Sequence, residues 1–149
     1  MIYVTGDLHG DFDRLNHPMI KKLKFADVLI VCGDFGFVWN GSKEEAKLLK
    51  KIGKRRYDTV FVEGCHDNYA IVTYRGGKAR QISGNLYQLL RGEVYEICGK
   101  KVFAFGGGDS GESGLDNPRW QPDEQPSEEE QQHGVDTLRA CHGKVDFIV

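Results

Sequence analysis

The sequence repeats one pattern three times: a short apolar run, then glycine, then a polar residue that can bind a metal ion. The apolar runs are residues 2–5, 27–32 and 59–62. The polar segments that follow them are, in the same order, Gly6-Asp7-Leu8-His9-Gly10, Gly33-Asp34 and Glu63-Gly64-Cys65-His66. Short runs of β-branched and aromatic residues are typical of buried strands. About two dozen residues separate successive runs, which leaves room for the helical crossovers that parallel strands need. The pattern therefore predicts an α/β fold built on a parallel sheet.

The polar residues after these runs are expected to share one edge of the sheet. Ligands of open α/β sheets bind beyond the carboxyl ends of the strands. Residues two apart in extended chain point to the same side, so Asp7 and His9 can converge on one point. A carboxylate and an imidazole in that arrangement predict either a metal site or an acid/base pair.

Five residues from the three turns form a candidate set for two divalent cations. They are Asp7, His9, Asp34, Cys65 and His66. Asp34 could bridge both ions. Two metal ions roughly 3.5–4 Å apart clamp a phosphoryl oxygen and lower the pKa of a bridging water. His66 could protonate the departing oxygen, because general acid catalysis needs a group that titrates near neutrality.

Helices are predicted between and after the strands. Residues 11–24 have a rough apolar face, but Pro18 argues against one continuous helix. Two capping boxes predict the starts of two further helices, the second ending near Cys141. Their residues are Ser42 with Glu45 and Ser127 with Glu130.

The second half of the sequence predicts an antiparallel hairpin followed by a long loop. Residues 93–98 and 101–105 flank Gly99-Lys100 and predict the hairpin. Residues 85–90 are a candidate strand, and residues 144–149 are a last apolar strand. Residues 106–125 are predicted to form a surface loop, and a loop of that length is often functional.

Composition sets bounds on the class of protein. A chain of 149 residues predicts one domain, and a net charge of -2 gives no argument for a nucleic-acid or membrane partner. We expect no signal peptide, and no apolar run in the sequence is long enough to span a bilayer. The four cysteines are widely spaced, so we expect reduced thiols in a cytoplasmic protein. Cys32 and Cys98 sit in strand patterns, which favours packing in the core.

With these motifs in place, the sequence resembles the calcineurin-like metallophosphoesterases. The likeness rests on Gly6-Asp7-Leu8-His9-Gly10, Gly33-Asp34 and Gly64-Cys65-His66-Asp67, in this order and each after a strand. The stretch from Arg119-Trp120 to Glu130 and residues 144–149 resemble one bacterial and phage branch of that family. The resemblance covers nearly the whole chain. It implies a four-layer α/β/β/α sandwich with a dinuclear Mn, Fe or Zn centre.

The resemblance also implies an activity and roles for residues. It implies hydrolysis of phosphate mono- or diesters, with Asp7, His9 and Asp34 as ligands, Asp34 bridging, and His66 as the acid. The family has asparagine where this chain has Cys65. A thiolate is softer than an amide oxygen and favours Zn or Fe over Mn or Mg. Cys65 as a metal ligand and Cys65 as a spectator thiol both stay open.

The family's further histidine ligands have no counterpart in this sequence. In the family they follow the last strand seen here, in a Thr-His or Gly-His motif and a later Gly-His-x-His motif. We therefore expect residues 1–149 to be an incomplete domain that lacks the C-terminal strands and has a weakened second metal site. An exposed sheet edge could then recruit another chain. The alternatives to an enzyme are a catalytically inactive relative that binds or regulates, and a truncated product with no independent role.

Overall fold

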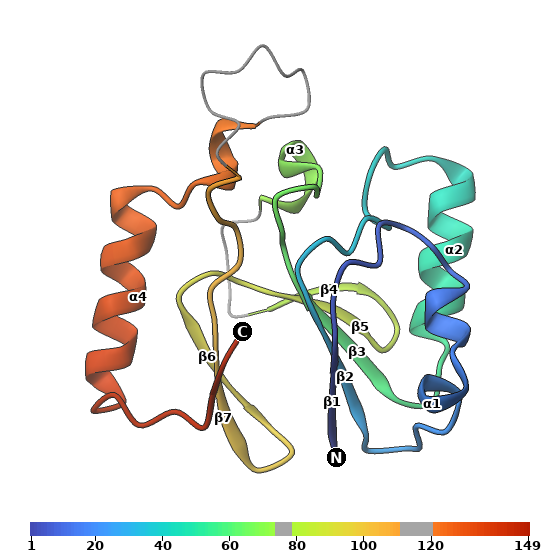
Figure 1. The fold of residues 1–149 in the computed structure, drawn as a ribbon, viewed down its shortest axis with the longest axis horizontal. Helices are drawn as coiled ribbons and strands as arrows, with labels where there is room; N and C mark the ends of the chain where they lie inside the picture. Colours follow the sequence, from blue (N-terminus) through green and yellow to red (C-terminus); the bar gives the residue numbers. More distant parts are fainter. Residues whose placement is uncertain (74–78, 111–120) are drawn as a thin grey trace.

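The computed structural model describes residues 1–73, 79–110 and 121–149. Two β-sheets lie face to face, and helices cover their outer faces (Figure 1). Helices α1 (Pro18–Lys21) and α2 (Lys43–Gly53) lie on the outer side of the first sheet. Helix α4 (Glu128–Ala140) lies on the outer side of the second. The predicted α/β/β/α sandwich is confirmed.

The first sheet has five strands in the order β1-β2-β3-β5-β4. They are β1 (Ile2–Thr5), β2 (Val28–Cys32), β3 (Asp58–Val62), β5 (Leu86–Leu89) and β4 (Ala79–Ser83). Strands β1, β2 and β3 are parallel, as predicted; β5 is also parallel to β3, and β4 runs antiparallel to β5. No prediction covered β4. It is an edge strand with mostly polar residues, so it carries little of the apolar periodicity that marks a strand.

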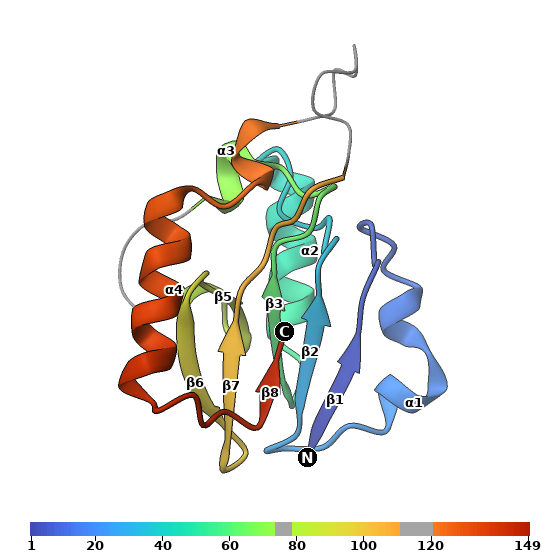
Figure 2. The same ribbon diagram turned by 60° about the vertical axis from the view of Figure 1, so that its left-hand side comes forward.

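The second sheet has three strands in the order β6-β7-β8. They are β6 (Glu93–Ile97), β7 (Lys100–Ala104) and β8 (Phe147–Ile148). The predicted hairpin is present, but its turn is Cys98-Gly99 and not Gly99-Lys100. Both turn residues have positive φ, 52° and 72°, as a two-residue hairpin turn of type I′ requires. Strand β8 is shorter than predicted and pairs in parallel with β7 (Figure 2).

Alternation along the central strands builds two cores. Leu29 and Val31 of β2 face the helices and belong to a cluster that includes Ile52 of α2. Val28 and Ile30, one residue out of step, face the second sheet and pack with residues such as Val102. Because Val28 to Val31 of β2 are buried on both faces, this stretch is apolar throughout.

Several local predictions need correction. Residues 11–24 form no long helix: a 3₁₀ turn, Arg14–Asn16, precedes α1, and Pro18 is the first residue of α1. Cys32 and Cys98 are exposed, so the prediction that they pack in the core is wrong. Each ends a strand or starts a turn, where the chain leaves the sheet.

The two predicted capping boxes have different outcomes. Ser127 and Glu130 form both reciprocal bonds of a capping box. Ser42 caps α2 by accepting a bond from Glu45 N, but the Glu45 carboxylate binds backbone N–H groups of the preceding loop. That loop is therefore held against the first turn of α2.

Two short elements complete the described chain. Helix α3 (Tyr69–Val72) follows the third polar turn, and a 3₁₀ turn, Pro122–Glu124, precedes α4. The predicted loop 106–125 lies partly outside the described residues, and so do Arg119 and Trp120. In the part of the chain that the structure describes, no helix has the length and apolar character to cross a bilayer.

Candidate metal centre

The first two polar turns are joined by backbone hydrogen bonds that continue the pairing of β1 and β2. The bonds run from Asp7 N to Gly33 O (3.3 Å), from His9 N to Asp34 O (2.9 Å) and from Gly10 N to Phe35 O (3.1 Å). The side chains after β1 and after β2 are thereby held at a fixed separation. The expectation that these turns share one rim of the sheet is confirmed.

Two glycines allow this close approach. A Cβ on Gly36, whose φ is +70°, would lie 2.5 Å from Gly10 N. A Cβ on Gly64 would lie 2.3 Å from both the backbone N and the Oδ1 atom of Asp34. Real Cβ atoms do not approach other atoms so closely, so any side chain at either position would push the turns apart.

The buried carboxylate of Asp67 fastens the third turn to the second. It accepts hydrogen bonds from the backbone N–H groups of Gly64 (2.9 Å), Gly36 (2.7 Å) and Phe35 (3.2 Å). Burial raises the pKa of Asp67, and these three bonds oppose that rise. The motif resemblance included Asp67 without a role. The structure makes it the clamp that positions its neighbours.

Three of the candidate ligands have unusual backbone conformations. Asp7, His9 and Asp34 have φ values of 53°, 47° and 51°, in the left-handed region that non-glycine residues seldom adopt. Such conformations cost of order 1–3 kcal/mol each and cluster at functional sites. The chain holds these side chains in place at a cost in stability, which supports a functional role.

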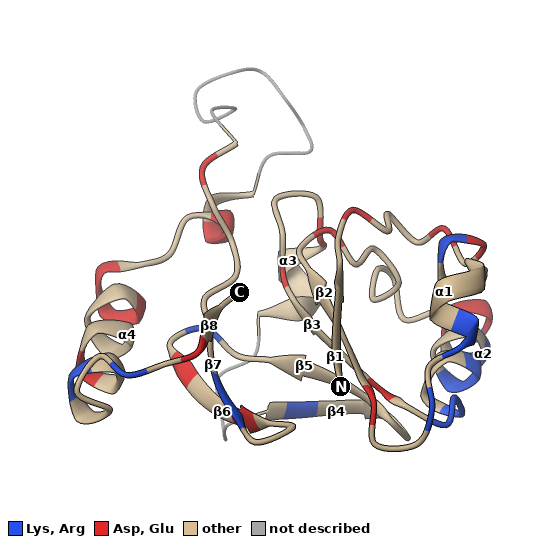
Figure 3. Cartoon of the chain, turned by 60° about the horizontal axis from the view of Figure 1, so that its bottom comes forward, with Lys and Arg blue, Asp and Glu red and all other residues tan. Residues whose placement is uncertain are grey.

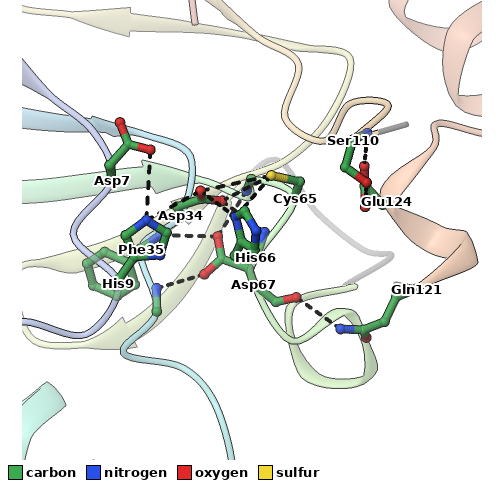
Figure 4. A network of polar contacts seen from close by, with 12 residues as sticks. Asp7, His9, Asp34, Phe35, Cys65, His66, Asp67, Ser110, Gln121 and Glu124 are labelled. Atoms are coloured by element: carbon green, nitrogen blue, oxygen red, sulfur yellow. Dashed lines mark hydrogen bonds and ion pairs between the residues drawn. The ribbon is translucent and has the colours of Figure 1, made fainter. Parts of the chain in front are cut away.

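The candidate ligand groups form a chain of short contacts with Asp34 at its centre (Figure 4). His9 Nε2 lies 4.0 Å from Asp7 Oδ1 and 3.8 Å from Asp34 Oδ2. His66 Nδ1 lies 3.0 Å from the same Asp34 oxygen, and Cys65 Sγ lies 3.9 Å from Asp34 Oδ1. Figure 4 shows Asp7 and His9 to one side of Asp34 and Cys65 and His66 to the other, with both imidazoles close to the same carboxylate oxygen.

The same three turns supply the most compact ligand group in the described residues. One ligand atom each from His9, Asp34 and His66 lies within 4.8 Å of the other two. Asp34 is buried, whereas both imidazoles are half-exposed. A buried carboxylate between accessible imidazoles is a donor set that suits divalent transition metals.

Electrostatics keep Asp34 ionised. Burial alone would raise its pKa, but hydrogen bonds from the backbone N–H and imidazole of His66, together with the nearby His9, hold the pKa below its ordinary value. The bond from His66 N to Asp34 Oδ1 is 2.9 Å long. An ionised carboxylate is the form that binds metal.

Cys65 lies beside this group with its thiol 3.2 Å from His66 Nδ1. Burial, with the negative charge of Asp34, raises the pKa of the Cys65 thiol. Without a cation, therefore, the thiol form is favoured. The geometry places Cys65 within reach of the Asp34–His66 side, and its role as ligand stays a prediction.

An open cavity of about 290 Å³ adjoins the centre. Asp7, Asp34 and Cys65 line it. Gly106 and Gly107, which follow β7, line it as well. The first residues of the predicted loop 106–125 therefore pass close to the site.

A buried ion pair supports the third turn from below. Arg91 Nε lies 2.7 Å from Glu63 Oε1, and each of these side chains is only 7% exposed. Arg91 also reaches Glu130 at the start of α4 (3.2 Å), and Tyr69 donates to Gly64 O (2.9 Å). Sequence reasoning missed this support. The one sign of this ion pair in the sequence was that Glu63 and Arg91 each follow a run that was predicted to be a strand.

These observations define an α/β sandwich with a candidate centre for divalent cations at the carboxyl rim of its parallel strands. The chain belongs to the calcineurin-like phosphoesterase family, whose profile matches residues 1–148. No curated protein and no solved structure matched the chain. Membership supports phosphoesterase activity and metal binding as the general function.

Proposed function

We propose that this protein is a metal-dependent phosphoesterase that hydrolyses phosphate mono- or diesters at a dinuclear centre. The observation that supports this most directly is the position of Asp34. Its carboxylate lies between His9 of the first turn and His66 and Cys65 of the third, and its Oδ2 atom is close to both imidazoles. A carboxylate so placed can be shared by two cations.

The donor set fits transition metals of intermediate softness. Imidazole and carboxylate suit Mn, Fe and Zn, and a thiolate would shift the preference toward Zn or Fe. When bound, two such cations lower the pKa of a bridging water and polarise the phosphoryl group. The protein holds their ligands by the backbone bonds of the turns and by the Asp67 clamp.

His66 has two candidate roles, because its imidazole is half-exposed and yet contacts Asp34. As a proton donor it would protonate the leaving oxygen of the substrate. As a ligand it would hold the cation on the Cys65 side. The variant His66→Gln separates the roles: loss of a ligand lowers metal content, whereas loss of an acid leaves metal content intact. In the second case, turnover falls most for aryl phosphates with poor leaving groups, which need protonation.

We propose further that Cys65 binds the second cation as a thiolate. Cobalt(II) substitution tests this, because cobalt bound to a thiolate shows a charge-transfer band in the near ultraviolet. The band should disappear in Cys65→Ser and persist in Cys32→Ser, a control thiol that lines the same cavity. A spectrum without the band in the unmodified protein would make Cys65 a spectator.

Metal content and hydrolysis together test the proposed function. The protein is loaded with Mn, Fe or Zn and assayed with an aryl phosphate monoester and diester. Two equivalents of metal, with turnover abolished by Asp34→Asn, are expected. Metal binding without turnover would favour the inactive binding module instead. No metal and no turnover would refute the enzyme.

A further inference from the structure

The formal net charge of -2 hides an uneven distribution of charge over the surface. Residues 43–56 contain seven basic and two acidic residues. Figure 3 shows basic residues gathered on α1 and α2, whereas the first turn of α4 is wholly acidic. The side of the molecule that carries α2 is therefore positive, although the chain as a whole is weakly acidic.

Four lysines form a straight row along the outer face of α2. They are Lys43, Lys47, Lys50 and Lys54. Their spacings of four, three and four residues place them on one face of the helix, and all four are exposed. The row extends over about 16 Å. Across the described residues, none of the four takes part in an ion pair.

Helix stability does not account for the lysine row. Like charges three or four residues apart repel one another and destabilise a helix. Glutamate at alternate positions would remove this repulsion and add favourable pairs, yet the row contains none. A ligand with regularly repeated negative charge would relieve the repulsion on binding.

Trp39 lies between the lysine row and the candidate metal centre. Its backbone N–H donates to the carboxylate of Glu45 in the first turn of α2 (3.0 Å). Its carbonyl accepts a bond from Asn68, two residues after His66 in the third polar turn. Trp39 is 47% exposed. Cationic side chains along a surface with an exposed aromatic ring are the combination that binds single-stranded nucleic acids.

We propose that the lysine row and Trp39 bind a single-stranded nucleic acid and lead its backbone to the metal centre. Lysines would neutralise phosphates, and an unpaired base would stack on Trp39. A duplex hides its bases from such a ring. A membrane is less suited, because Trp39 is a single large apolar side chain, and the exposed neighbours of the row on α2, Glu44, Ala46 and Lys51, add none that could insert with it.

The inference rests on the proposed function for the fate of the bound strand. Water would add its oxygen to phosphorus, the bond from phosphorus to the leaving sugar oxygen would break, and a proton would pass to that oxygen. The binding itself needs no metal. It can therefore be measured separately, in the presence of a chelator.

The test is fluorescence anisotropy with a labelled oligothymidylate of about 20 nucleotides, without metal. The double variant Lys47→Gln/Lys50→Gln should weaken binding at least tenfold at low salt. It should also reduce the slope of log affinity against log salt by about 1.4, since each phosphate contact to a single strand contributes roughly 0.7. The variant Trp39→Ala should weaken binding roughly tenfold and leave the slope unchanged.

A matched control carries the same change in charge elsewhere. Lys101→Gln/Lys144→Gln alters two exposed lysines on the side of the second sheet, and its affinity should stay within twofold of the unmodified protein. Equal losses in both double variants would overturn the proposal, as would binding to phosphatidylserine vesicles but not to the oligonucleotide. Tighter binding to a duplex of the same length would also overturn it. Metal-free binding without later hydrolysis would refute the proposed function alone.

Discussion

Replacement of Asp67 by alanine tests whether one buried carboxylate holds the candidate metal centre together. Asp67 is 1% exposed and accepts three backbone hydrogen bonds, two from the second turn and one from the third. In Asp67→Ala the three N–H groups lose their partner. Two of them, those of Phe35 and Gly64, belong to buried residues.

The expected loss of stability follows from the number of orphaned donors. A buried donor left unsatisfied costs about 1–3 kcal/mol. Water can reach the half-buried Gly36, so a total of roughly 3–5 kcal/mol is expected, not the full sum. For a chain of this size each kcal/mol lowers the melting temperature by about 2–4 °C. The melting temperature of Asp67→Ala should therefore fall by about 6–20 °C.

Thermal and urea unfolding followed by circular dichroism measure this loss. Asp67→Asn keeps one carbonyl oxygen as an acceptor and should lose about half as much. Asp136→Ala removes an exposed carboxylate on α4 and should change stability by less than about 0.5 kcal/mol. A loss below about 1 kcal/mol in Asp67→Ala would refute the assignment of Asp67 as the clamp between the turns.

Three further predictions concern the same turns and the second sheet. Gly64→Ala should destabilise the fold by about 1–3 kcal/mol and weaken metal binding, because the added methyl group would clash with Asp34. Isothermal titration calorimetry measures the affinity for metal. Asp7→Gly should be about 1 kcal/mol more stable than Asp7→Ala in urea unfolding, since glycine relieves the left-handed backbone; equal stabilities would argue against strain. A hydrogen bond from Lys100 holds the pKa of Asp146 below its ordinary 3.8. Its contribution is thus present above pH 3.8 and lost as pH falls further, so the stability gap between the unmodified protein and Asp146→Asn should be constant near neutrality and narrow in acid.

Much of the fold was predictable because the signals were local. The apolar runs before Gly33 and Gly64 are buried on both faces of the first sheet, so their composition alone identified parallel strands, whereas the run before Gly6 is an edge strand with Val4 exposed. Pro18 correctly divided residues 11–24, because proline cannot continue a helix through its own position.

The remainder depended on tertiary contacts that no local pattern encodes. Strand β4 is a polar edge strand, and Glu45 leaves its capping partner to bind the loop at Trp39. Cys32 ends an apolar strand, yet it is exposed where the chain turns away from the sheet.

The candidate site also has a part that local sequence predicted and a part that depends on tertiary contacts. Asp7, His9, Asp34 and His66 follow their strands at fixed short distances, so sheet topology alone brought them together. The partners of Arg91 lie 28 and 39 residues away in sequence, and only the fold brings them into contact. The spacing of the lysines on α2 can be read from the sequence, but that they form no ion pair with any described residue emerged only in three dimensions.

Anomalous scattering from crystals grown with Mn²⁺ tests the central claim most directly, because it locates cations without reference to activity. The proposal predicts two peaks roughly 3.5–4 Å apart, one on each side of the Asp34 carboxylate. One should lie beside Asp7 and His9, and the other beside Cys65 and His66. No peak at Asp34, or a single peak that Asp34→Asn leaves in place, would contradict it.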